Sequence, residues 1–290
     1  MTIRIDLHNH FASADEIRNL NLDKVLSHVS KKLGPGGIVG IVNFPRTSMK
    51  NKDRYGELKK HAGGRAIDKN YSLYFPEQDL WVVKGQEVPV IYRGEEVHLL
   101  HMGLRSETHM TFQRPSLENS LEEGKSYGSM IGADHPADIT GIQRFLARDE
   151  GLKKTILPYF DMWGIFDGEV WLMRKKMGEV VVPILWPFLN NSAKEYYEEN
   201  IKLQYSIGAV AESDGHSISE IGTSYTILDI PKFNPDIDGE EMINNLRITI
   251  KNNKDWKGKR KYNILHTLIH GIGGKKENKL RKLLERYYYT

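Results

Sequence analysis

The chain alternates between short apolar runs and amphipathic segments, an order that predicts strands and helices in turn. Apolar runs typical of buried strands occupy residues 2–8, 38–42, 81–84, 97–100, 129–133 and 205–211. Helical spacing of apolar residues occurs between these runs, at residues 23–32, 117–123, 139–148, 193–204 and 240–250. This order favours an α/β protein with a parallel sheet, either open or closed. The Lys/Gly-rich stretch 50–78 lacks a clear period, and we expect a surface excursion there.

Histidines and acidic residues follow the predicted strands at the points where those strands end. They are His8, His10, Glu87, His98, His135, Asp214 and His216. Because strand side chains repeat with period two, a His-x-His pair presents two imidazoles on one side, and an Asp-x-His pair presents a carboxylate with an imidazole. Parallel α/β barrels place their chemistry at the carboxyl ends of their strands. The pattern therefore predicts a metal cluster at one mouth of a barrel.

The run Val97-His98-Leu99-Leu100-His101 offers two histidines to this cluster. They are three positions apart, so in a strand they face opposite sides and only one can point inward; we choose His98. His135 follows a strand that Pro136 ends, since proline cannot continue a ladder. Glu87 is the best candidate to bridge two metal ions, because one carboxylate can use both of its oxygens.

The chain contains no cysteine, which excludes disulfides and thiolate metal sites. Any metal must be held by imidazole and carboxylate groups, a set that suits divalent Zn, Mn or Fe. Imidazole ligands usually need a hydrogen-bond acceptor that fixes their tautomer, and Asp6 and Asp134 are candidates for that role.

Charge is unevenly distributed along the 290 residues. Residues 251–290 contain twelve Lys/Arg and three Asp/Glu, a balance of +9, whereas the whole chain carries +3, so residues 1–250 carry −6. We expect an acidic barrel at 1–250 and a basic helical C-terminal extension at 251–290. The extension either packs on the barrel with a solvated basic face or binds a phosphate-rich partner such as nucleic acid.

No apolar run approaches the roughly 18 residues of a membrane span. A strand is predicted almost at residue 1, without a signal-like apolar region. We therefore expect a cytoplasmic protein without a membrane partner.

These motifs resemble those of the PHP (polymerase and histidinol phosphatase) family of metal-dependent phosphoesterases. The resemblance rests on Asp6-Leu7-His8-Asn9-His10, Gly85-Gln86-Glu87, Val97-His98-Leu99-Leu100, Asp134-His135-Pro136 and Ser213-Asp214-Gly215-His216, in the family's order, over residues 1–228. It implies a distorted seven-stranded, TIM-like (β/α)7 barrel. It also implies a further metal ligand at Asp15.

The second family motif departs from the usual pattern. Where the family has Thr-Asp-His, the aligned stretch is Ile41-Val42-Asn43-Phe44, and a phenylalanine cannot bind a metal ion. The resemblance therefore implies two firmly held ions and a third that is weak or missing. A catalytically degenerate, metal-binding PHP module is the alternative without enzymatic activity.

The resemblance also distributes the ligands among the ions. One ion is expected on His8, His10, Glu87 and Asp214, and its neighbour on Glu87, His98 and His135. Asp15 and His216 face the third position. Paired ions about 3.5–4 Å apart generate hydroxide at neutral pH and clamp phosphoryl oxygens, so the catalytic candidates are Glu87, Asp214 and His216.

The expected enzyme is a phosphoric ester hydrolase that acts on a small phosphomonoester or a nucleotide. Candidates for binding the substrate phosphate are Arg46, Lys84 and Arg144, which lie near predicted strand ends or on flanking loops. The alternative enzyme is a nuclease that acts on DNA or RNA ends, with the basic extension holding the strand.

Overall fold

The computed structural model describes residues 2–10, 12–43, 53–111, 114–168, 172–177, 180–185, 188–262, 280, 283 and 285–289. The strands are β1 (Ile3–Asp6), β2 (Gly37–Asn43), β3 (Ile67–Asp68), β4 (Ser72–Phe75), β5 (Leu80–Tyr92), β6 (Glu95–Met102), β7 (Met130–Ala133), β8 (Met162–Asp167), β9 (Leu172–Met177), β10 (Val180–Leu185), β11 (Gly208–Glu212), β12 (Tyr225–Leu228) and β13 (Gly258–Lys259). The helices are α1 (Ala14–Ile17), α2 (Leu22–Leu33), α3 (Arg54–Ala62), α4 (Leu117–Ser126), α5 (Gln143–Leu146), α6 (Glu150–Ile156), α7 (Phe188–Asn200) and α8 (Gly239–Asn252).

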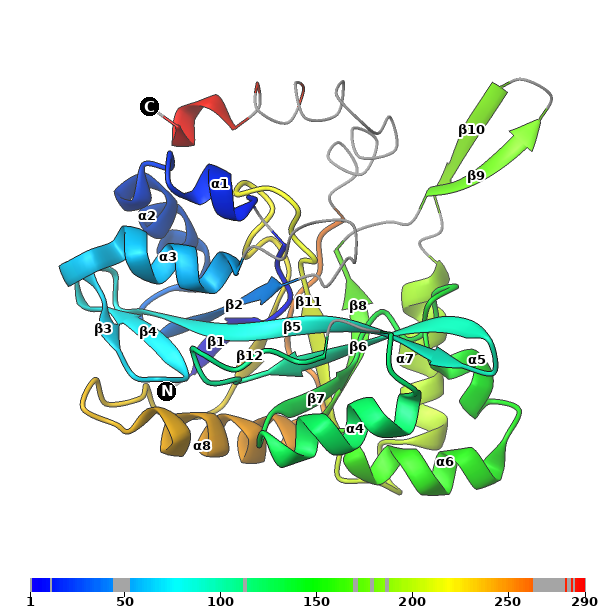
Figure 1. Cartoon of the computed structure of the whole chain (residues 1–290). Coiled ribbons are helices and arrows are strands. Elements are labelled where there is room, and N and C mark those ends of the chain that lie inside the picture. The colour runs from blue at the N-terminus through cyan, green and yellow to red at the C-terminus, as the bar shows by residue number, and fades with distance from the viewer. Residues whose placement is uncertain are drawn as a thin grey trace.

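A mixed sheet forms the centre of the molecule and curves into a nearly closed barrel (Figure 1). Within the described residues its path contains nine strands in the order β11-β8-β7-β6-β5-β2-β1-β12-β13. The strands β1, β2, β5, β7, β8 and β11 run in one direction, whereas β6 and β12 run in the other. The short strands β3 and β4 extend the sheet beside β5.

The barrel closes between β11 and β12 through a side chain. Thr226 Oγ1 of β12 accepts a hydrogen bond from the backbone N–H of Ala211 in β11 at 2.7 Å and donates to the carbonyl oxygen of Ala211 at 3.2 Å. On the outer edge of β11, the backbone of Ala209 is hydrogen-bonded in both directions to Asn253, which follows α8. β13 pairs with β12. The described residues just after 250 are therefore bonded to the barrel.

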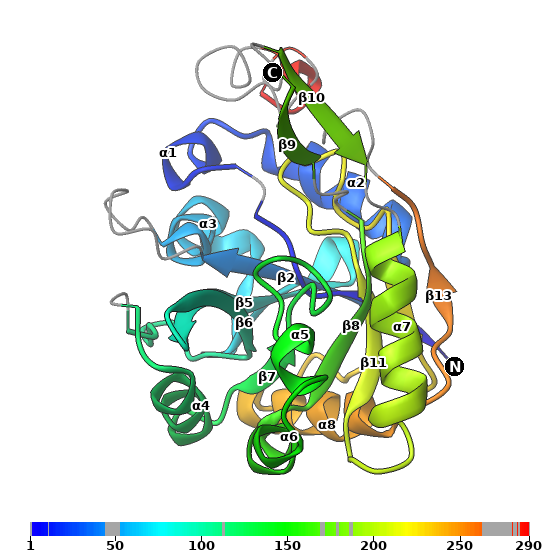
Figure 2. The same ribbon diagram turned by 90° about the vertical axis from the view of Figure 1, so that its right-hand side faces the viewer.

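Apolar side chains fill the barrel interior, so it is a packed core. Trp81 and Val83 of β5 belong to it, and so do Ile5, Leu100 and Val210 from other strands. One end of the barrel is covered by α8 (Figures 1 and 2), whose inward side chains are Met242, Ile243, Leu246 and Ile250. The parallel strands run towards the opposite mouth.

Two groups of helices cover the outer face of the sheet. On one side α2 and α3 pack on β2 and β5, with Leu26 and Leu58 against Val39 and Val82. On the other side α4, α6 and α7 cover β6, β7 and β8. α7 lies along β8 (Figure 2), and Trp163 Nε1 donates to the carbonyl oxygen of Ala193 at 3.2 Å.

The predicted α/β barrel is present, but the expectation of a purely parallel sheet was wrong. β5 continues to Tyr92 and turns back through Arg93 and Gly94, whose φ angles are 52° and 81°. Two consecutive left-handed residues are what a type I′ hairpin turn requires, so β6 runs antiparallel to β5. The nine-strand path also does not reproduce the seven strands that the resemblance implied.

The described part of the stretch 50–78, residues 53–78, is more ordered than a surface excursion. It forms α3, β3 and β4, and α3 buries Tyr55, Leu58 and Ala62 against the sheet. The helical part of the predicted extension lies largely outside the described residues, and the division at residue 250 stays a prediction. Among the described helices, none is both long and apolar enough to cross a membrane.

Candidate metal centre

The first and last predicted ligand motifs are bonded directly to each other. β1 ends at Asp6, and the chain continues so that Asn9 pairs with Gly215 in an isolated parallel bridge. His10 donates its backbone N–H to the Gly215 carbonyl oxygen at 2.7 Å. Glycine is required here, because a Cβ on Gly215 would lie 2.6 Å from Asn9 Oδ1. The bridge brings His8 and His10 against the segment 213–216.

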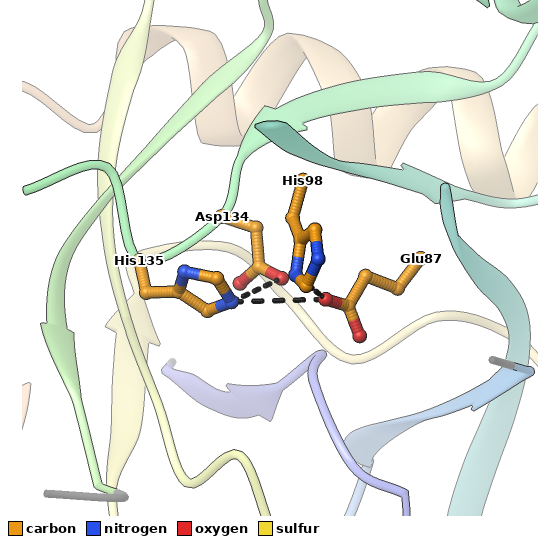
Figure 3. Close-up of side chains that lie close together, drawn as sticks. All are labelled: Glu87, His98, Asp134 and His135. Atoms are coloured by element: carbon orange, nitrogen blue, oxygen red, sulfur yellow. Dashed lines mark ion pairs between the residues drawn. The ribbon is translucent and has the colours of Figure 1, made fainter. Parts of the chain in front are cut away.

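Glu87 lies at the centre of the cluster, and its two carboxylate oxygens face two different pairs of histidines. Oε2 lies 2.8 Å from His10 Nε2 and 3.8 Å from His8 Nε2. Oε1 contacts His98 Nδ1 and lies 3.7 Å from His135 Nε2 (Figure 3). None of the five side chains is more than 8% exposed, so their charges must be compensated within the cluster.

A second carboxylate joins the His8 and His10 pair. The Nε2 atoms of His8 and His10 lie 2.8 Å apart. Asp214 Oδ1 lies 3.5 Å from His8 Nε2 and 3.9 Å from His10 Nε2. Two ligand atoms at right angles on one ion, with bonds near 2.1 Å, would lie about 3.0 Å apart. The spacing of these two imidazoles therefore fits a single shared ion.

The structure turns His98 towards Glu87 and His101 to the opposite face of β6. His98 is the fourth of the eight residues of β6, not at a strand end, and it reaches the mouth because β6 runs antiparallel to β5. His101 is fully buried between the sheet and α4, where its ring nitrogens lie 3.2 Å from Ser120 Oγ and Ser129 Oγ. Glu87 likewise lies within β5, which extends five residues beyond it.

Outer carboxylates and carbonyls fix the orientation of the imidazoles. His8 Nδ1 lies 2.9 Å from Asp134 Oδ1, which leaves Nε2 for the centre, and His98 Nε2 lies 3.1 Å from Glu96 Oε1, which leaves Nδ1 for it. Such partners set the tautomer of a ligand histidine. The structure thus places Asp134 as the hydrogen-bond acceptor of an imidazole, which is the role predicted for it. Asp6 accepts backbone N–H groups of Ser213 and Gly222 at 2.9 and 2.7 Å instead.

The ionisation of the central groups follows from burial and mutual contact. Burial alone would raise the pKa of Glu87, but the surrounding imidazoles, His98 first among them, hold it well below its usual value. Burial lowers the pKa of His10 to about 4 against the opposing effect of Glu87. The central carboxylate is therefore charged and the His10 imidazole neutral, which are their ligand forms. Against the effect of burial, the surrounding carboxylates raise the pKa of His8, His98 and His135, so these three imidazoles must release a proton when they bind an ion.

The cluster includes two further acidic residues, Glu212 and Asp167, which the sequence patterns did not single out. Glu212 Oε2 lies 3.9 Å from His8 Nδ1, and Asp167 ends β8. Burial raises the pKa of Glu212 to about 8, and burial with the nearby Asp214 carboxylate raises that of Asp167 well above its usual value. Glu212 follows the predicted strand 205–211 directly, so its position at a strand end was an available signal.

Two of the clustered residues lie in backbone conformations that side chains rarely adopt. His135 has φ of 24° and Asp214 has φ of 43°. Left-handed conformations of non-glycine residues cost of order 1–3 kcal/mol each and concentrate at functional sites. The strain at these two positions is consistent with a functional cluster.

The two residues expected to face a third ion lie in different surroundings. His216 is partly exposed, its ring centroid is 5.1 Å from that of His10, and its Nδ1 donates to the Asp214 carbonyl oxygen at 3.0 Å. Asp15 is in the exposed first turn of α1 and pairs with Arg18 at 3.0 Å. The structure thus brings His216 to the rim of the cluster but does not bring Asp15 into the buried group.

The prediction that Lys84 binds the substrate phosphate is wrong. Lys84 lies three positions before Glu87 in β5 and therefore on the opposite face. It is fully buried beneath α3, donates from Nζ to the Ser106 carbonyl oxygen at 2.6 Å and lies 3.7 Å from Asp53 Oδ2. Burial lowers its pKa, and its ammonium group anchors the loop that contains Ser106.

The variant Lys84→Met is therefore expected to change stability and not substrate binding. Loss of the donor to Ser106 should lower the free energy of unfolding by about 1–3 kcal/mol, while KM for a phosphomonoester stays within about twofold of the wild-type value. Urea denaturation and steady-state kinetics measure the two effects. A tenfold rise in KM without loss of stability would restore Lys84 to the substrate site.

The other candidate phosphate ligands are placed differently. Arg144 in α5 pairs with Glu95 Oε2 at 2.6 Å and lies over the Phe145 ring. Arg46 and Phe44 lie outside the described residues. Arg54, which the sequence patterns did not single out, brings a guanidinium to the clustered histidines. Its Nη1 lies 3.4 Å from His10 Nδ1 and donates to the Val42 carbonyl oxygen at 3.0 Å.

Comparison with known proteins gives structural but not sequence relatives. No family model matches the chain, and no curated protein matches it. The fold is similar to that of PsfC from Pseudomonas syringae PB-5123, with a TM-score of 0.51 and 12% identity over 98% of this chain and 99% of that one.

Two other solved structures are similar at lower TM-scores. The lesion-specific endonuclease PfuEndoQ from Pyrococcus furiosus matches at 0.48 with 15% identity, over 89% of this chain and 58% of that one. A two-domain protein from Bacteroides vulgatus ATCC 8482, described as containing a predicted PHP-like metal-dependent phosphoesterase, matches at 0.48 with 12% identity, over 85% and 64%. This chain thus spans less than two thirds of either.

Proposed function

We propose that the protein is a metal-dependent phosphoesterase whose centre holds two divalent ions bridged by Glu87. The observation that carries the proposal is the division of the Glu87 carboxylate: one oxygen faces His8 and His10, and the other faces His98 and His135. A carboxylate shared in this way between two sets of imidazoles is the arrangement that a bridged pair of ions needs. Buried His, Glu and Asp donors without sulfur suit Zn, Mn or Fe.

In this proposal each residue of the cluster has a stated role. His8, His10 and Asp214 hold one ion with Glu87, and His98 and His135 hold the other. His216 offers Nε2 to a third, weaker ion at the rim. When bound, divalent ions would supply the positive charge and the activated water that hydrolysis of a phosphate ester requires.

The chain's own residues orient this centre and limit access of water to it. Asp134 and Glu96 hold the rings of His8 and His98, and Arg54 places a positive charge beside His10. Apolar side chains fill the barrel interior, so we expect a substrate to approach the cluster from the mouth. Such positioning is the protein's main contribution to phosphoryl transfer, because the reaction needs little covalent chemistry from side chains. We assign this chemistry to the barrel, residues 1–250, and a small phosphomonoester or nucleotide to the mouth.

Removal of metal is expected to abolish the activity reversibly. Treatment with a chelator should lower hydrolysis of a chromogenic phosphomonoester by about 10³-fold or more, and Mn, Zn or Fe(II) should restore it. Circular dichroism before and after chelation controls for unfolding. A parallel assay with phosphodiesters, nucleotides and single-stranded DNA and RNA separates a phosphatase from a nuclease. No turnover of any substrate with any of these metals would contradict the proposal and favour a catalytically degenerate metal-binding module.

A further inference from the structure

The carboxylate of Glu285, from the C-terminal segment, is hydrogen-bonded to the turn that follows His216. Glu285 lies 65 or more positions along the chain from this turn and is only 2% exposed. Its Oε2 accepts the backbone N–H of Ile218 at 3.1 Å. Its Oε1 accepts the backbone N–H of Ser219 at 3.3 Å and the hydroxyl of Ser219 at 2.8 Å. Three donors from two adjacent residues thus converge on one carboxylate.

The same turn is held from two other sides. Lys32 Nζ donates to the carbonyl oxygens of Ser219 and Ile221 at 2.6 and 2.8 Å. Within the turn, Glu220 Oε2 accepts the backbone N–H of His216 and the hydroxyl of Ser217, both at 2.9 Å. Hydrogen bonds therefore connect the backbone of His216 to Ile218 and Ser219, the two residues that donate to Glu285.

The segment that carries Glu285 is fixed to the barrel independently of this contact. Tyr288 is 7% exposed and packs among the apolar residues beneath α2. Its hydroxyl lies 2.8 Å from His28 Nδ1, and its carbonyl oxygen accepts the backbone N–H of Asn21 at 2.7 Å. The anchored segment thus presents Glu285 to the turn in a defined position.

The geometry points to Glu285 as a positioning residue of the metal centre, which holds His216 in place through the backbone of the 217–219 turn. His216 is the most exposed of the clustered histidines. Its Nδ1 donates to the Asp214 backbone carbonyl oxygen at 3.0 Å and lies 3.7 Å from Asp214 Oδ1, so both contacts come from two residues away in the same segment. Its position therefore depends on the backbone around it. The inference rests on the proposed function, because it assigns His216 to an ion at the rim, and it makes the C-terminal segment part of the site.

The test is a double-mutant cycle between Glu285 and His216 in the full chain. Glu285→Gln keeps the shape but leaves one acceptor where three donors converge, and it should weaken the last-bound Mn²⁺ by about tenfold and lower kcat similarly. In the His216→Ala background the same substitution should change either quantity by less than about twofold. Glu77→Gln, the same substitution at an exposed glutamate in the turn between β4 and β5, is the matched control, so its Mn²⁺ binding should match wild type.

If Glu285→Gln lowers Mn²⁺ affinity and kcat equally with and without His216, Glu285 has a general structural role and the inference is overturned. Unaltered Mn²⁺ binding in the single variant His216→Ala would also overturn it. Ser219→Ala, which removes only the hydroxyl contact, is the second variant if Glu285→Gln does not fold, and a smaller weakening of the same ion is expected. Mn²⁺ titration followed by electron paramagnetic resonance needs no substrate. An inactive wild-type protein would therefore contradict the proposed function while the titration still decides the role of Glu285.

Discussion

Replacement of Glu87 by glutamine is expected to lower phosphoesterase activity by about 10³-fold or more and to reduce the metal content of the purified protein. The amide keeps the size of the side chain but has one oxygen where the carboxylate has two. The structure places one of those oxygens against His10 and the other against His98, so the amide can supply an oxygen to only one half of the centre and the other half loses a ligand. It also removes the buried negative charge that both ions would share.

Steady-state kinetics with a chromogenic phosphomonoester and elemental analysis of the protein measure the two effects. Glu77→Gln is the matched control, because Glu77 is exposed in the turn between β4 and β5 and has no contact with the cluster. The control should keep wild-type metal content and kcat/KM. A Glu87→Gln protein with full metal content and activity within tenfold of wild type would show that Glu87 does not bridge two ions.

The choice between the two histidines of β6 could be made from the sequence, because it depends on a local rule. Period two along a strand placed His98 and His101 on opposite faces, and the structure shows one at the mouth and the other beneath α4. The same rule, applied from Glu87, would have excluded Lys84 from the substrate site. Two residues three positions apart in β5 cannot both face the barrel interior.

The direction of β6 was the main error in the predicted fold. The signal was present, since Arg93-Gly94 opens a four-residue polar stretch between two apolar runs, and a two-residue connection that contains glycine is typical of a tight hairpin. Without the hairpin, His98 was expected at a strand end. It reaches the cluster from the middle of its strand instead, because antiparallel pairing returns the chain to the same mouth.

Exposure and long-range contacts could not be predicted from the sequence. Asp15 follows His10 closely but lies in the exposed first turn of α1, where it pairs with Arg18. The contact between Glu285 and the turn after His216 joins segments more than 60 residues apart, and no spacing or period marks it. Pairings of this kind depend on how the whole barrel folds, and short-range patterns carry no information about them.

The second large effect is expected on stability, at low pH, from His101. Burial lowers the pKa of this imidazole from 6.5 to about 3, and two serine hydroxyls are its partners. Below pH 6.5 the unfolded chain binds a proton at this position, whereas the folded chain does so only near pH 3. The contribution of His101 to stability is therefore fully present above pH 6.5 and is lost as the pH falls from 6.5 towards 3.

Between pH 8 and pH 4.5, this single group should cost the wild-type protein about 3 kcal/mol of unfolding free energy. His101→Gln and His101→Asn cannot bind this proton, so each should lose about 3 kcal/mol less than wild type over the same interval. An amide that fits the Ser120 and Ser129 hydroxyls poorly lowers the free energy of unfolding by the same amount at every pH. The pH dependence is therefore compared in two variants, whose amides differ in length. Urea denaturation at the two pH values gives the difference directly. An identical pH dependence in wild type and both variants would mean that His101 binds its proton equally in the folded and unfolded chain, which is incompatible with the buried position between β6 and α4.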